Sequence, residues 1–416
     1  MQYTLKAPAQ LRCDIKLPAS KSISNRVLVI HALRGGGIEP ENLSDCDDTE
    51  VVMRALRDNP YEINIKAAGT AMRFMTAYLS VTEGEHVITG TERMKHRPIQ
   101  ILVDALQSIG AEIEYVGEEG YPPLRISGKR LNGGTLEISG STSSQYITAL
   151  LLVAPALRDG LTLHLSGEII SRPYIDLTLC TMREFGISAE WTSHDTITVK
   201  HGTYSDMPYY IENDWSAASY WYEMMALCDD AQATVRLEGL KDGSRQGDSQ
   251  LRYIFSLLGV KTSFEVDAND STRTTVVLRR NRCPLRRLDY DFSGCPDLAQ
   301  TFVVTCCMLG LPFRFEGLST LKIKETDRIE ALKTELRKLG FVLQDENGSI
   351  LLWDGTRCNP DASMGIDTYE DHRMAMALAP AAFKTEGLKI NNPEVVSKSY
   401  PSFWKDLEKA GFVINE

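Results

Sequence analysis

No stretch of this sequence is apolar for long enough to cross a membrane. The longest apolar runs, 146–157 and 302–313, cover about a dozen residues, whereas a membrane-spanning helix needs about 20. The first residues also lack the apolar core of a signal peptide. The nine cysteines form no C-x-x-C pair and stand singly except at Cys306-Cys307, which is typical of reduced thiols. We therefore expect a cytoplasmic protein.

Several motifs that would identify a known chemistry are also missing. The sequence contains no G-x-x-x-x-G-K-[ST] phosphate loop, no G-x-G-x-x-G after a strand and no elbow around a nucleophilic serine. His31, His86, His164, His194 and His201 have no partner at metal-ligand spacing. The acidic run 45–48 lacks the glycine and distal glutamate of a calcium loop. These absences count against nucleotide-loop, serine-hydrolase and metal-dependent chemistry.

Length and charge describe an ordinary globular protein of two or three domains. The chain has 416 residues, of which 43% are hydrophobic and 24% charged. Its 45 basic and 56 acidic residues leave a net charge of −11, which argues against non-specific binding to nucleic acid. A small anionic substrate remains compatible, because local charge can oppose the net charge.

What the sequence does contain is an internal repeat. Six apolar helix candidates begin after small or polar clusters, near residues 24, 70, 144, 216, 298 and 372. An amphipathic helix follows each and ends at a residue suited to a positive φ angle. These ends are Asn59, Gly110, Gly186, Gly259, Gly340 and Gly411. Because strands separate the helices, we expect α/β layers arranged as two domains of three units each.

The polar residues that open these helices indicate an anion site. Helix N-termini leave free N–H groups and carry partial positive charge, so several converging starts would bind an anion. Lys21–Arg26, Ser143–Gln145 and Asp371–Arg373 stand at three of the starts. Lys95–Pro98 is expected to open another helix, where cations are unfavourable unless they serve a ligand. Simple helix caps are the expectation for Ser24, Ser216 and the acidic run 45–48.

A second cationic stretch, Lys322–Arg328, includes a carboxylate. In a helix beginning near Glu325, Arg328 lies about one turn on, so Lys324, Glu325 and Arg328 share a rim. A carboxylate among cations stays ionised, and could then exchange a proton with a substrate carbon. A solvated run of charges would look the same in isolation, but the other clusters with the same bias favour a site.

Taken in order, these clusters resemble the signature of the 5-enolpyruvylshikimate-3-phosphate (EPSP) synthase family of the shikimate pathway. The resemblance runs from about residue 5 to the end of the chain. Its eight motifs are Leu17–Arg26, Ala68–Arg73, Arg93–Pro98, Gly140–Gln145, Ser171–Asp176, Lys324–Arg328, Asp371–Met376 and Ser397-Lys398. Eight motifs in one order make a specific match.

The resemblance implies a particular α/β architecture, the two-domain enolpyruvyl transferase fold. Each domain has three βαβαββ units, six repeats in all, and the active site lies in the interdomain cleft. One domain would be 20–211, inserted into a discontinuous domain formed by 1–19 and 212–416. The resemblance also implies a monomer that needs no cofactor or metal. Its partners would be two small-molecule substrates, with no nucleic acid and no membrane.

Members of this family act in chorismate and aromatic amino acid biosynthesis. They transfer the enolpyruvyl group of phosphoenolpyruvate to the 5-hydroxyl of shikimate 3-phosphate and release phosphate. The hydroxyl adds to C2 while C3 takes a proton, and elimination of phosphate from the tetrahedral intermediate then returns that proton. The reaction therefore needs acid–base groups on both sides of the reacting carbons.

The family's site residues carry over motif by motif. Asp297 resembles the base that faces the 5-hydroxyl, Glu325 resembles the group that exchanges a proton at C3, and Lys21 assists. The residues that resemble contacts to shikimate 3-phosphate are Lys21, Ser22, Arg26, Ser143, Ser144, Gln145, Ser171, Tyr174, Asp297 and Lys324. Those that resemble contacts to phosphoenolpyruvate are Lys21, Gly69, Arg97, Gln145, Arg328, Arg373 and Lys398.

The chain departs from the common family pattern in places, and two alternatives stay open. The departures, at Ala19, Ala67, Phe74, Trp215 and Thr320, bear on loop geometry and glyphosate sensitivity and remove no charged catalytic group. The first alternative is the sister enolpyruvyl transferase that acts on UDP-N-acetylglucosamine. That enzyme usually has a loop cysteine near 95–97, and this chain has none between Cys46 and Cys180. The second is a non-catalytic metabolite-binding homologue, which would not need the carboxylates Asp297 and Glu325.

Overall fold

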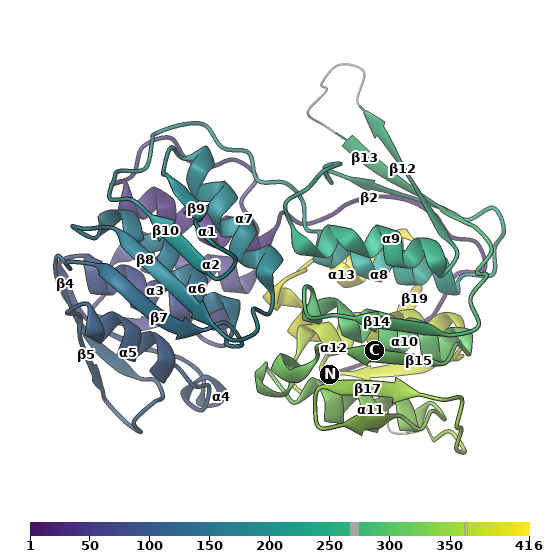
Figure 1. Ribbon diagram of the computed structural model, residues 1–416. Helices are drawn as coiled ribbons and strands as arrows, with labels where there is room; N and C mark the ends of the chain where they lie inside the picture. Colours follow the sequence, from purple (N-terminus) through teal and green to yellow (C-terminus); the bar gives the residue numbers. More distant parts are fainter. Residues whose placement is uncertain (267–273, 362, 364) are drawn as a thin grey trace. The chain divides into compact units, whose positions relative to one another are not determined.

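The chain divides into two compact units. The computed structural model describes residues 1–266, 274–361, 363 and 365–416 (Figure 1). The discontinuous unit joins Met1–Pro18 to Glu212–Glu416, and the inserted unit is Ala19–Ile211. The first boundary lies one residue before the position expected from the sequence. Each unit has a hydrophobic core of its own.

The inserted unit contains two four-stranded sheets of identical topology. Their strand orders are β3-β4-β6-β5 and β7-β8-β10-β9, and in each the first pair is parallel and the other pairs are antiparallel. The strands are β3 (Glu62–Asn64), β4 (Gly84–Thr89), β5 (Glu112–Tyr115), β6 (Leu124–Gly128), β7 (Gly134–Ser139), β8 (Leu161–Ser166), β9 (Ala189–Trp191) and β10 (Thr196–Val199). The helices between them are α3 (Gly69–Val81), the single turn α4 (Glu92–Lys95), α5 (Gln100–Ser108), α6 (Ser144–Val153) and α7 (Arg172–Glu184). Two βαβαββ units are thus complete.

The third copy in the inserted unit is reduced to its helices. These are α1 (Lys21–Leu33) and α2 (Asp47–Asp58), which pack against each other and against α3. Within the described part of 19–61 no strand forms. Ala19 is a single bridge residue, and an isolated parallel bridge joins Glu41 to Tyr210. The predicted α/β architecture of two units is confirmed, and in this third copy the described connecting segments form isolated bridges and no sheet.

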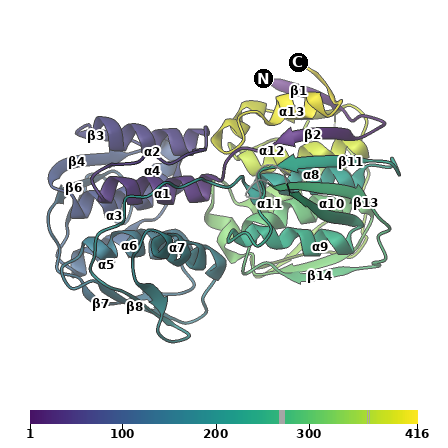
Figure 2. The same cartoon turned by 90° about the horizontal axis from the view of Figure 1, so that it is seen from above.

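Two sheets of the discontinuous unit repeat the same topology, and a third is three-stranded and antiparallel; the N-terminal strands lie in this unit (Figure 2). Its sheets have the orders β12-β13-β11-β2, β14-β15-β17-β16 and β18-β1-β19. The strands are β1 (Gln2–Lys6), β2 (Arg12–Lys16), β11 (Thr234–Glu238), β12 (Val260–Val266), β13 (Thr274–Arg280), β14 (Leu288–Asp291), β15 (Phe313–Glu316), β16 (Gln344–Glu346), β17 (Ile350–Trp353), β18 (Leu388–Asn391) and β19 (Val413–Asn415). The helices are α8 (Trp215–Leu227), α9 (Leu251–Leu257), α10 (Ala299–Leu309), α11 (Arg328–Lys338), α12 (His372–Leu378) and α13 (Phe403–Lys409).

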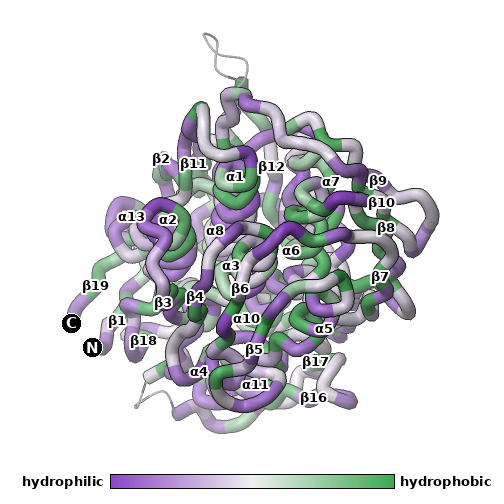
Figure 3. Tube along the Cα trace, turned by 90° about the vertical axis from the view of Figure 1, so that its left-hand side faces the viewer, coloured by the Kyte–Doolittle hydropathy of each residue, from purple (hydrophilic) through white to green (hydrophobic). Residues whose placement is uncertain are grey.

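The six predicted helix ends are confirmed by the backbone. Asn59, Gly110, Gly186, Gly259, Gly340 and Gly411 all have positive φ angles, between 41° and 101°. The helices that open each repeat are mostly buried, and α6 and α10 expose few residues, as their hydropathy indicates (Figure 3). None of the described helices has both the length and the apolar composition needed to cross a membrane.

Two predicted helix caps are wrong. Helix α1 begins at Lys21 and is capped by Ser20, so Ser24 lies inside the helix, where its hydroxyl accepts the Ser44 N–H at 3.0 Å. Helix α8 is capped by Asp214, whose carboxylate accepts the Ser216 N–H at 2.8 Å. The acidic run does lie at a helix start, in the first turn of α2, where negative charge favours the helix dipole.

A carboxylic acid lies in the core of the discontinuous unit. Glu223 in α8 is fully buried, and within the described residues neither of its oxygens has a hydrogen-bond partner. The neighbouring Thr305 hydroxyl donates instead to the Thr301 carbonyl at 2.7 Å. Burial raises the pKa of Glu223 well above its ordinary value. Burial therefore favours the neutral, protonated form of this side chain.

Replacing Glu223 by glutamine should stabilise the protein increasingly as the pH rises. The unfolded chain releases this proton near the ordinary carboxyl pKa, whereas the folded chain keeps it to higher pH. Stability is thus complete at low pH and falls by about 1.4 kcal/mol per pH unit between the two pKa values. Urea unfolding of Glu223→Gln and of the exposed control Glu386→Gln, from pH 4 to 8, measures this. Parallel curves for parent and Glu223→Gln would contradict the buried-acid interpretation.

Candidate active site

Arg328 is the centre of a buried ion-pair cluster in the discontinuous unit. Its Nε and Nη2 donate to the two carboxylate oxygens of Asp371, at 2.6 and 3.2 Å. Its Nη1 donates to Asp297 Oδ1 and its Nη2 to Glu325 Oε2, both at 2.9 Å. Arg328 is only 1% exposed, so these bonds form away from bulk water. One guanidinium therefore orients three carboxylates that are far apart in the sequence.

Three further cations surround these carboxylates. Lys324 Nζ lies 3.2 Å from Asp297 Oδ1, and Lys398 Nζ donates to Glu325 Oε1 at 2.6 Å. Arg373 donates from Nη1 to the Asp297 backbone carbonyl at 3.2 Å, and its Nη2 lies 3.5 Å from Asp297 Oδ2. The cluster thus combines four cations with three carboxylates. This arrangement attracts an anion and keeps acid–base groups beside it.

Burial and neighbouring charges shift the pKa values of three groups in the cluster. Burial opposes ionisation of Asp297, but the charges of Lys324, Arg373 and Arg328 outweigh it and hold the pKa of Asp297 well below its usual range. Burial likewise opposes the charge of Arg328, but its three carboxylate partners outweigh burial and raise the pKa of Arg328. For Lys324 burial is the larger effect, and it lowers the pKa despite the attraction of Asp297.

The starts of three helices and the end of a fourth bring this cluster together. Asp297 lies in the 3₁₀ helix η3 (Pro296–Leu298) before α10, and Lys398 ends η6 (Pro393–Lys398). Asp371 caps α12 by accepting the Arg373 N–H at 2.9 Å. Helix α11 begins at Arg328 and not near Glu325, because Asp327 caps it and accepts the N–H groups of Ile329 and Glu330. Glu325 therefore lies in the preceding connection, yet still reaches Arg328.

In the inserted unit, Arg26 connects the first turns of two helices. It donates to the carbonyls of Ser22 and Tyr174, at 2.7 and 3.2 Å, and thereby joins α1 to α7. It also donates to the hydroxyls of Thr178 and Thr148, at 2.8 and 3.4 Å. Burial lowers the pKa of Arg26 to about 10, so it stays protonated at neutral pH. Four of its five donors serve α1, α6 and α7, which leaves one donor for a ligand.

The other predicted residues of the inserted unit lie at the same group of helix starts. Lys21, the first residue of α1, pairs with Asp48 of α2 at 3.1 Å. Gln145 at the start of α6 donates to the Thr70 hydroxyl at the start of α3, at 3.1 Å. Ser143 caps α6, and Ser144 is its first residue. Ser171 and Tyr174 lie at the start of α7.

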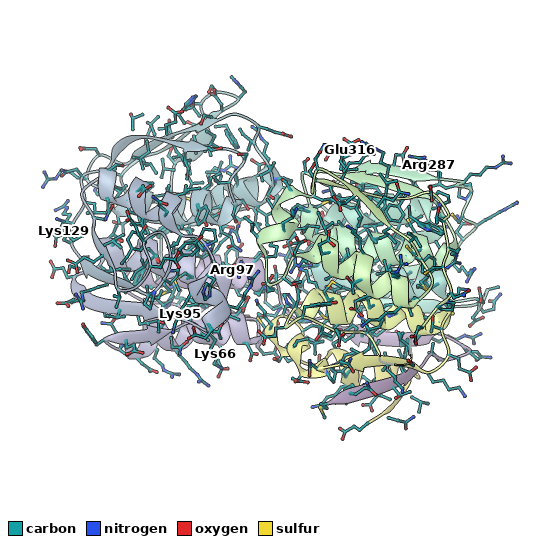
Figure 4. The ribbon with its side chains drawn as sticks, turned by 90° about the horizontal axis from the view of Figure 1, so that it is seen from below. Lys66, Lys95, Arg97, Lys129, Arg287 and Glu316 are labelled. Carbon is teal, nitrogen blue, oxygen red and sulfur yellow. The ribbon has the colours of Figure 1, made fainter. Side chains whose placement is uncertain are left out.

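Arg97 stands between helices and does not open one. The short helix α4 ends at Lys95 and α5 begins at Gln100, so the expectation that Lys95–Pro98 opens a helix is wrong. Lys95 instead lies in the last turn of α4, where a cation favours the helix dipole. The Arg97 guanidinium lies against Gly69, at whose position a Cβ atom would come within 2.7 Å of it. Figure 4 shows Arg97 and Lys95.

Arg73 supports this placement of Arg97. It donates to the Gly69 carbonyl at 3.2 Å and to the Pro98 carbonyl at 2.7 Å. The Tyr146 hydroxyl donates to the same Pro98 carbonyl at 2.5 Å. The segment that carries Arg97 is therefore bound to the starts of both α3 and α6.

Two acidic residues of these clusters escaped the sequence analysis. Asp371 was interpreted only as part of a cap cluster, although it is the bidentate partner of Arg328. Asp48 was assigned to a capping run, although it is the partner of Lys21 and only 4% exposed. Both lie at helix starts, where aspartate is common as a cap, so the neighbouring sequence does not indicate that each also pairs with a cation. An aspartate inside a cation-rich motif was the available hint.

Solved structures that share this fold include two enolpyruvyl transferases. An EPSP synthase from Acinetobacter baumannii superposes with a TM-score of 0.77 at 20% identity, each chain covered fully. The enolpyruvyl transferase NikO from Streptomyces tendae gives a TM-score of 0.74 at 16% identity, covering 100% of this chain and 98% of NikO. At these identities the likeness establishes the fold class alone.

Sequence comparisons establish the family. The family model described as EPSP synthase (3-phosphoshikimate 1-carboxyvinyltransferase) matches residues 57–407. A 3-phosphoshikimate 1-carboxyvinyltransferase of Bacteroides fragilis is 57% identical over 414 residues, covering 100% of this chain and 99% of the relative. One from Photobacterium profundum is 34% identical, with 97% of each chain covered. The chain belongs to the EPSP synthase family.

Proposed function

We propose that this chain is a 3-phosphoshikimate 1-carboxyvinyltransferase. It transfers the enolpyruvyl group of phosphoenolpyruvate to the 5-hydroxyl of shikimate 3-phosphate and releases phosphate, in aromatic amino acid biosynthesis. The observation that carries the proposal is the pair of carboxylates, Asp297 and Glu325, held on one buried arginine and ringed by cations. The full-length relatives of this name support it. We further propose that the enzyme acts as a cytoplasmic monomer.

The acid–base groups suit an addition followed by an elimination. Asp297 accepts the proton of the 5-hydroxyl as that oxygen attacks C2. Glu325 takes up a proton when the substrates bind, delivers it to C3 and takes one back when phosphate leaves, so it serves as both acid and base. Lys21 and Lys324 assist by stabilising negative charge on the reacting groups. The common contact of Asp297 and Glu325 with Arg328 supports a shared role, because it orients both carboxylates together.

Under this proposal, the residues that contact each substrate come from both units. Shikimate 3-phosphate contacts Lys21, Ser22, Arg26, Ser143, Ser144, Gln145, Ser171 and Tyr174 of the inserted unit, with Asp297 and Lys324 of the discontinuous unit. Phosphoenolpyruvate contacts Lys21, Gly69, Arg97 and Gln145 of the first, with Arg328, Arg373 and Lys398 of the second. Serine hydroxyls and helix N–H groups suit a phosphate, and guanidinium groups suit both a phosphate and a carboxylate.

Substrate binding also supplies a way to activate Asp297. In the ligand-free protein the charges of Lys324, Arg373 and Arg328 hold its pKa well below the usual range, against the effect of burial. A carboxylate with so low a pKa is a weak base. An anionic substrate that draws Lys324 and Arg373 toward itself weakens these pairs and raises the proton affinity of Asp297. The base thus becomes effective when the substrate is in place.

A phosphate-release assay tests the function directly. The purified chain is incubated with phosphoenolpyruvate and, in turn, with shikimate 3-phosphate, with UDP-N-acetylglucosamine or with no acceptor. We expect continuous phosphate release only when the acceptor is shikimate 3-phosphate. Release with UDP-N-acetylglucosamine would indicate the sister transferase. Binding of both substrates without release would indicate a non-catalytic homologue.

The variants Arg97→Ala and Arg373→Ala should weaken phosphoenolpyruvate selectively. Each loses a charge-assisted contact, which lowers the affinity for this ligand about ten- to a hundred-fold. Calorimetry with shikimate 3-phosphate alone should show a much smaller change. Arg287→Ala is the control, since Arg287 is exposed and pairs only with Asp289 among the described residues (Figure 4). Equal losses for the two ligands would remove these arginines from the phosphoenolpyruvate site.

A further inference from the structure

The start of α7 is held in a strained conformation. Ser171 precedes the helix with φ 54° and ψ 32°, in the left-handed region that non-glycine residues seldom adopt. Its side chain makes no capping hydrogen bond to the helix, although serine is a favoured cap. The Ser171 side chain therefore does not itself fix the helix start. Other contacts must hold this conformation.

An indole ring lies across the first turn of α7. The Arg172 guanidinium is stacked over the Trp191 ring, 4.0 Å from its centre. The Trp191 Nε1 donates to Asp176 Oδ1 at 2.8 Å. Arg172 and Asp176 are four residues apart and so lie on one face of the helix. The ring of β9 thus binds the first turn of α7 at two points.

Hydrogen bonds hold the turn of the β9–β10 hairpin, which carries Trp191. Arg172 Nη1 donates to the His194 carbonyl in the β9–β10 turn, at 3.2 Å. Asp195 accepts hydrogen bonds from Ser193 and Thr196 inside the same turn, at 2.5 and 3.0 Å. The β9–β10 turn is therefore hydrogen-bonded both internally and to Arg172.

Arg172 also needs an explanation of its own. A cation in the first turn of a helix faces the positive end of the helix dipole, which is unfavourable. Stacking on Trp191 and the bond to His194 compensate for this position. The helix start is in turn bound to Arg26, which donates to the Tyr174 carbonyl. A shift of α7 would therefore move Ser171, Tyr174 and Arg26 together.

We propose that Trp191, with Arg172 and Asp176, is a positioning device for shikimate 3-phosphate. The three side chains need not touch the substrate. They hold the start of α7 so that Ser171 and Tyr174 meet the phosphorylated acceptor in one geometry. This inference rests on the proposed function, because it assigns the start of α7 to that substrate.

The test separates positioning from simple stability. Trp191→Ala, Trp191→Phe and Arg172→Ala are compared with the parent and with Arg357→Ala. Arg357 provides a matched control, because its guanidinium stacks over Phe341 at 3.8 Å in the discontinuous unit. The readouts are affinity for shikimate 3-phosphate by calorimetry, KM for each substrate, kcat and melting temperature.

We expect Trp191→Ala and Arg172→Ala to weaken shikimate 3-phosphate about five- to thirty-fold, the range of one stacked cation. The KM for phosphoenolpyruvate should stay within about twofold of the parent. Trp191→Phe keeps a ring for Arg172 and should recover part of the loss, whereas Arg357→Ala should lower only the melting temperature.

Two results would overturn this inference. The first is a lower melting temperature with unchanged affinity for shikimate 3-phosphate, and the second is an equal loss for both substrates. If Trp191→Ala does not fold, Arg172→Ala, which alters only a half-buried side chain, decides the question. A parent protein that neither binds nor converts shikimate 3-phosphate would instead contradict the proposed function, so the two failures are distinguishable.

Discussion

Glu325→Gln should bind both substrates but turn them over about a hundred- to ten-thousand-fold more slowly. Glutamine keeps the size of the side chain and can still accept a hydrogen bond from Arg328 or Lys398. It cannot take a proton from C3 or return one. Ligand affinity by calorimetry and turnover by phosphate release, measured on the same preparation, separate binding from chemistry.

The control for this variant is Glu330→Gln. Glu330 belongs to the neighbouring helix α11 and pairs with Lys333 at 2.8 Å on the surface. Its loss should leave turnover unchanged. If Glu325 served only as an ion-pair partner, Glu325→Gln would cost stability and leave turnover within about five-fold of the parent, well below the range of an acid–base group. That result would remove Glu325 from the catalytic residues.

Arg328→Met should cause the largest loss of stability among single substitutions in the cluster. It removes the cation between Asp297, Glu325 and Asp371, and Asp371 is fully buried. Breaking a buried ion pair by removing one partner costs about 3–5 kcal/mol, because the remaining charge stays uncompensated. Urea unfolding, followed by fluorescence, measures the change in the free energy of unfolding.

Arg287→Met provides the matched comparison for Arg328→Met. The Arg287–Asp289 pair has a similar distance, 2.8 Å, but both side chains are more than half exposed. Its loss should cost at most about 1 kcal/mol. Comparable losses for the two variants would show that the Arg328 cluster contributes no more than a surface pair. The difference between them isolates the effect of burial.

Much of the fold could be predicted from local sequence signals. Glycine or asparagine after an amphipathic helix reports a positive φ angle, and all six such ends are found where expected. Helix starts were less predictable, because serine and aspartate are plentiful near them. Ser20, and not Ser24, caps α1, and Asp327 delays the start of α11 to Arg328. The loss of strands from the third copy of the inserted unit depends on pairing between distant segments, which local sequence does not report.

The candidate site was predictable by residue type but not by partner. The sequence indicated cations at helix starts and the carboxylate Glu325, and the structure brings the residues of each unit together. The sequence did not reveal that Arg328 would be the buried centre of the cluster. It also did not reveal that Asp371 would pair with Arg328, or Asp48 with Lys21. Such pairs join residues tens of positions apart, so only the folded chain defines them.

The central claim is that Glu325 exchanges a proton with C3 of phosphoenolpyruvate during addition and elimination. In D₂O, addition places deuterium on C3 and creates a methyl group whose hydrogens become equivalent by rotation. Elimination then leaves deuterium in the vinyl group of the product, which proton NMR detects as lost vinyl intensity. We predict that the parent enzyme, given both substrates, forms a product that contains deuterium. In Glu325→Gln the rate of deuterium entry should fall by the same factor as the rate of turnover. Phosphate release without deuterium in the product would contradict the account.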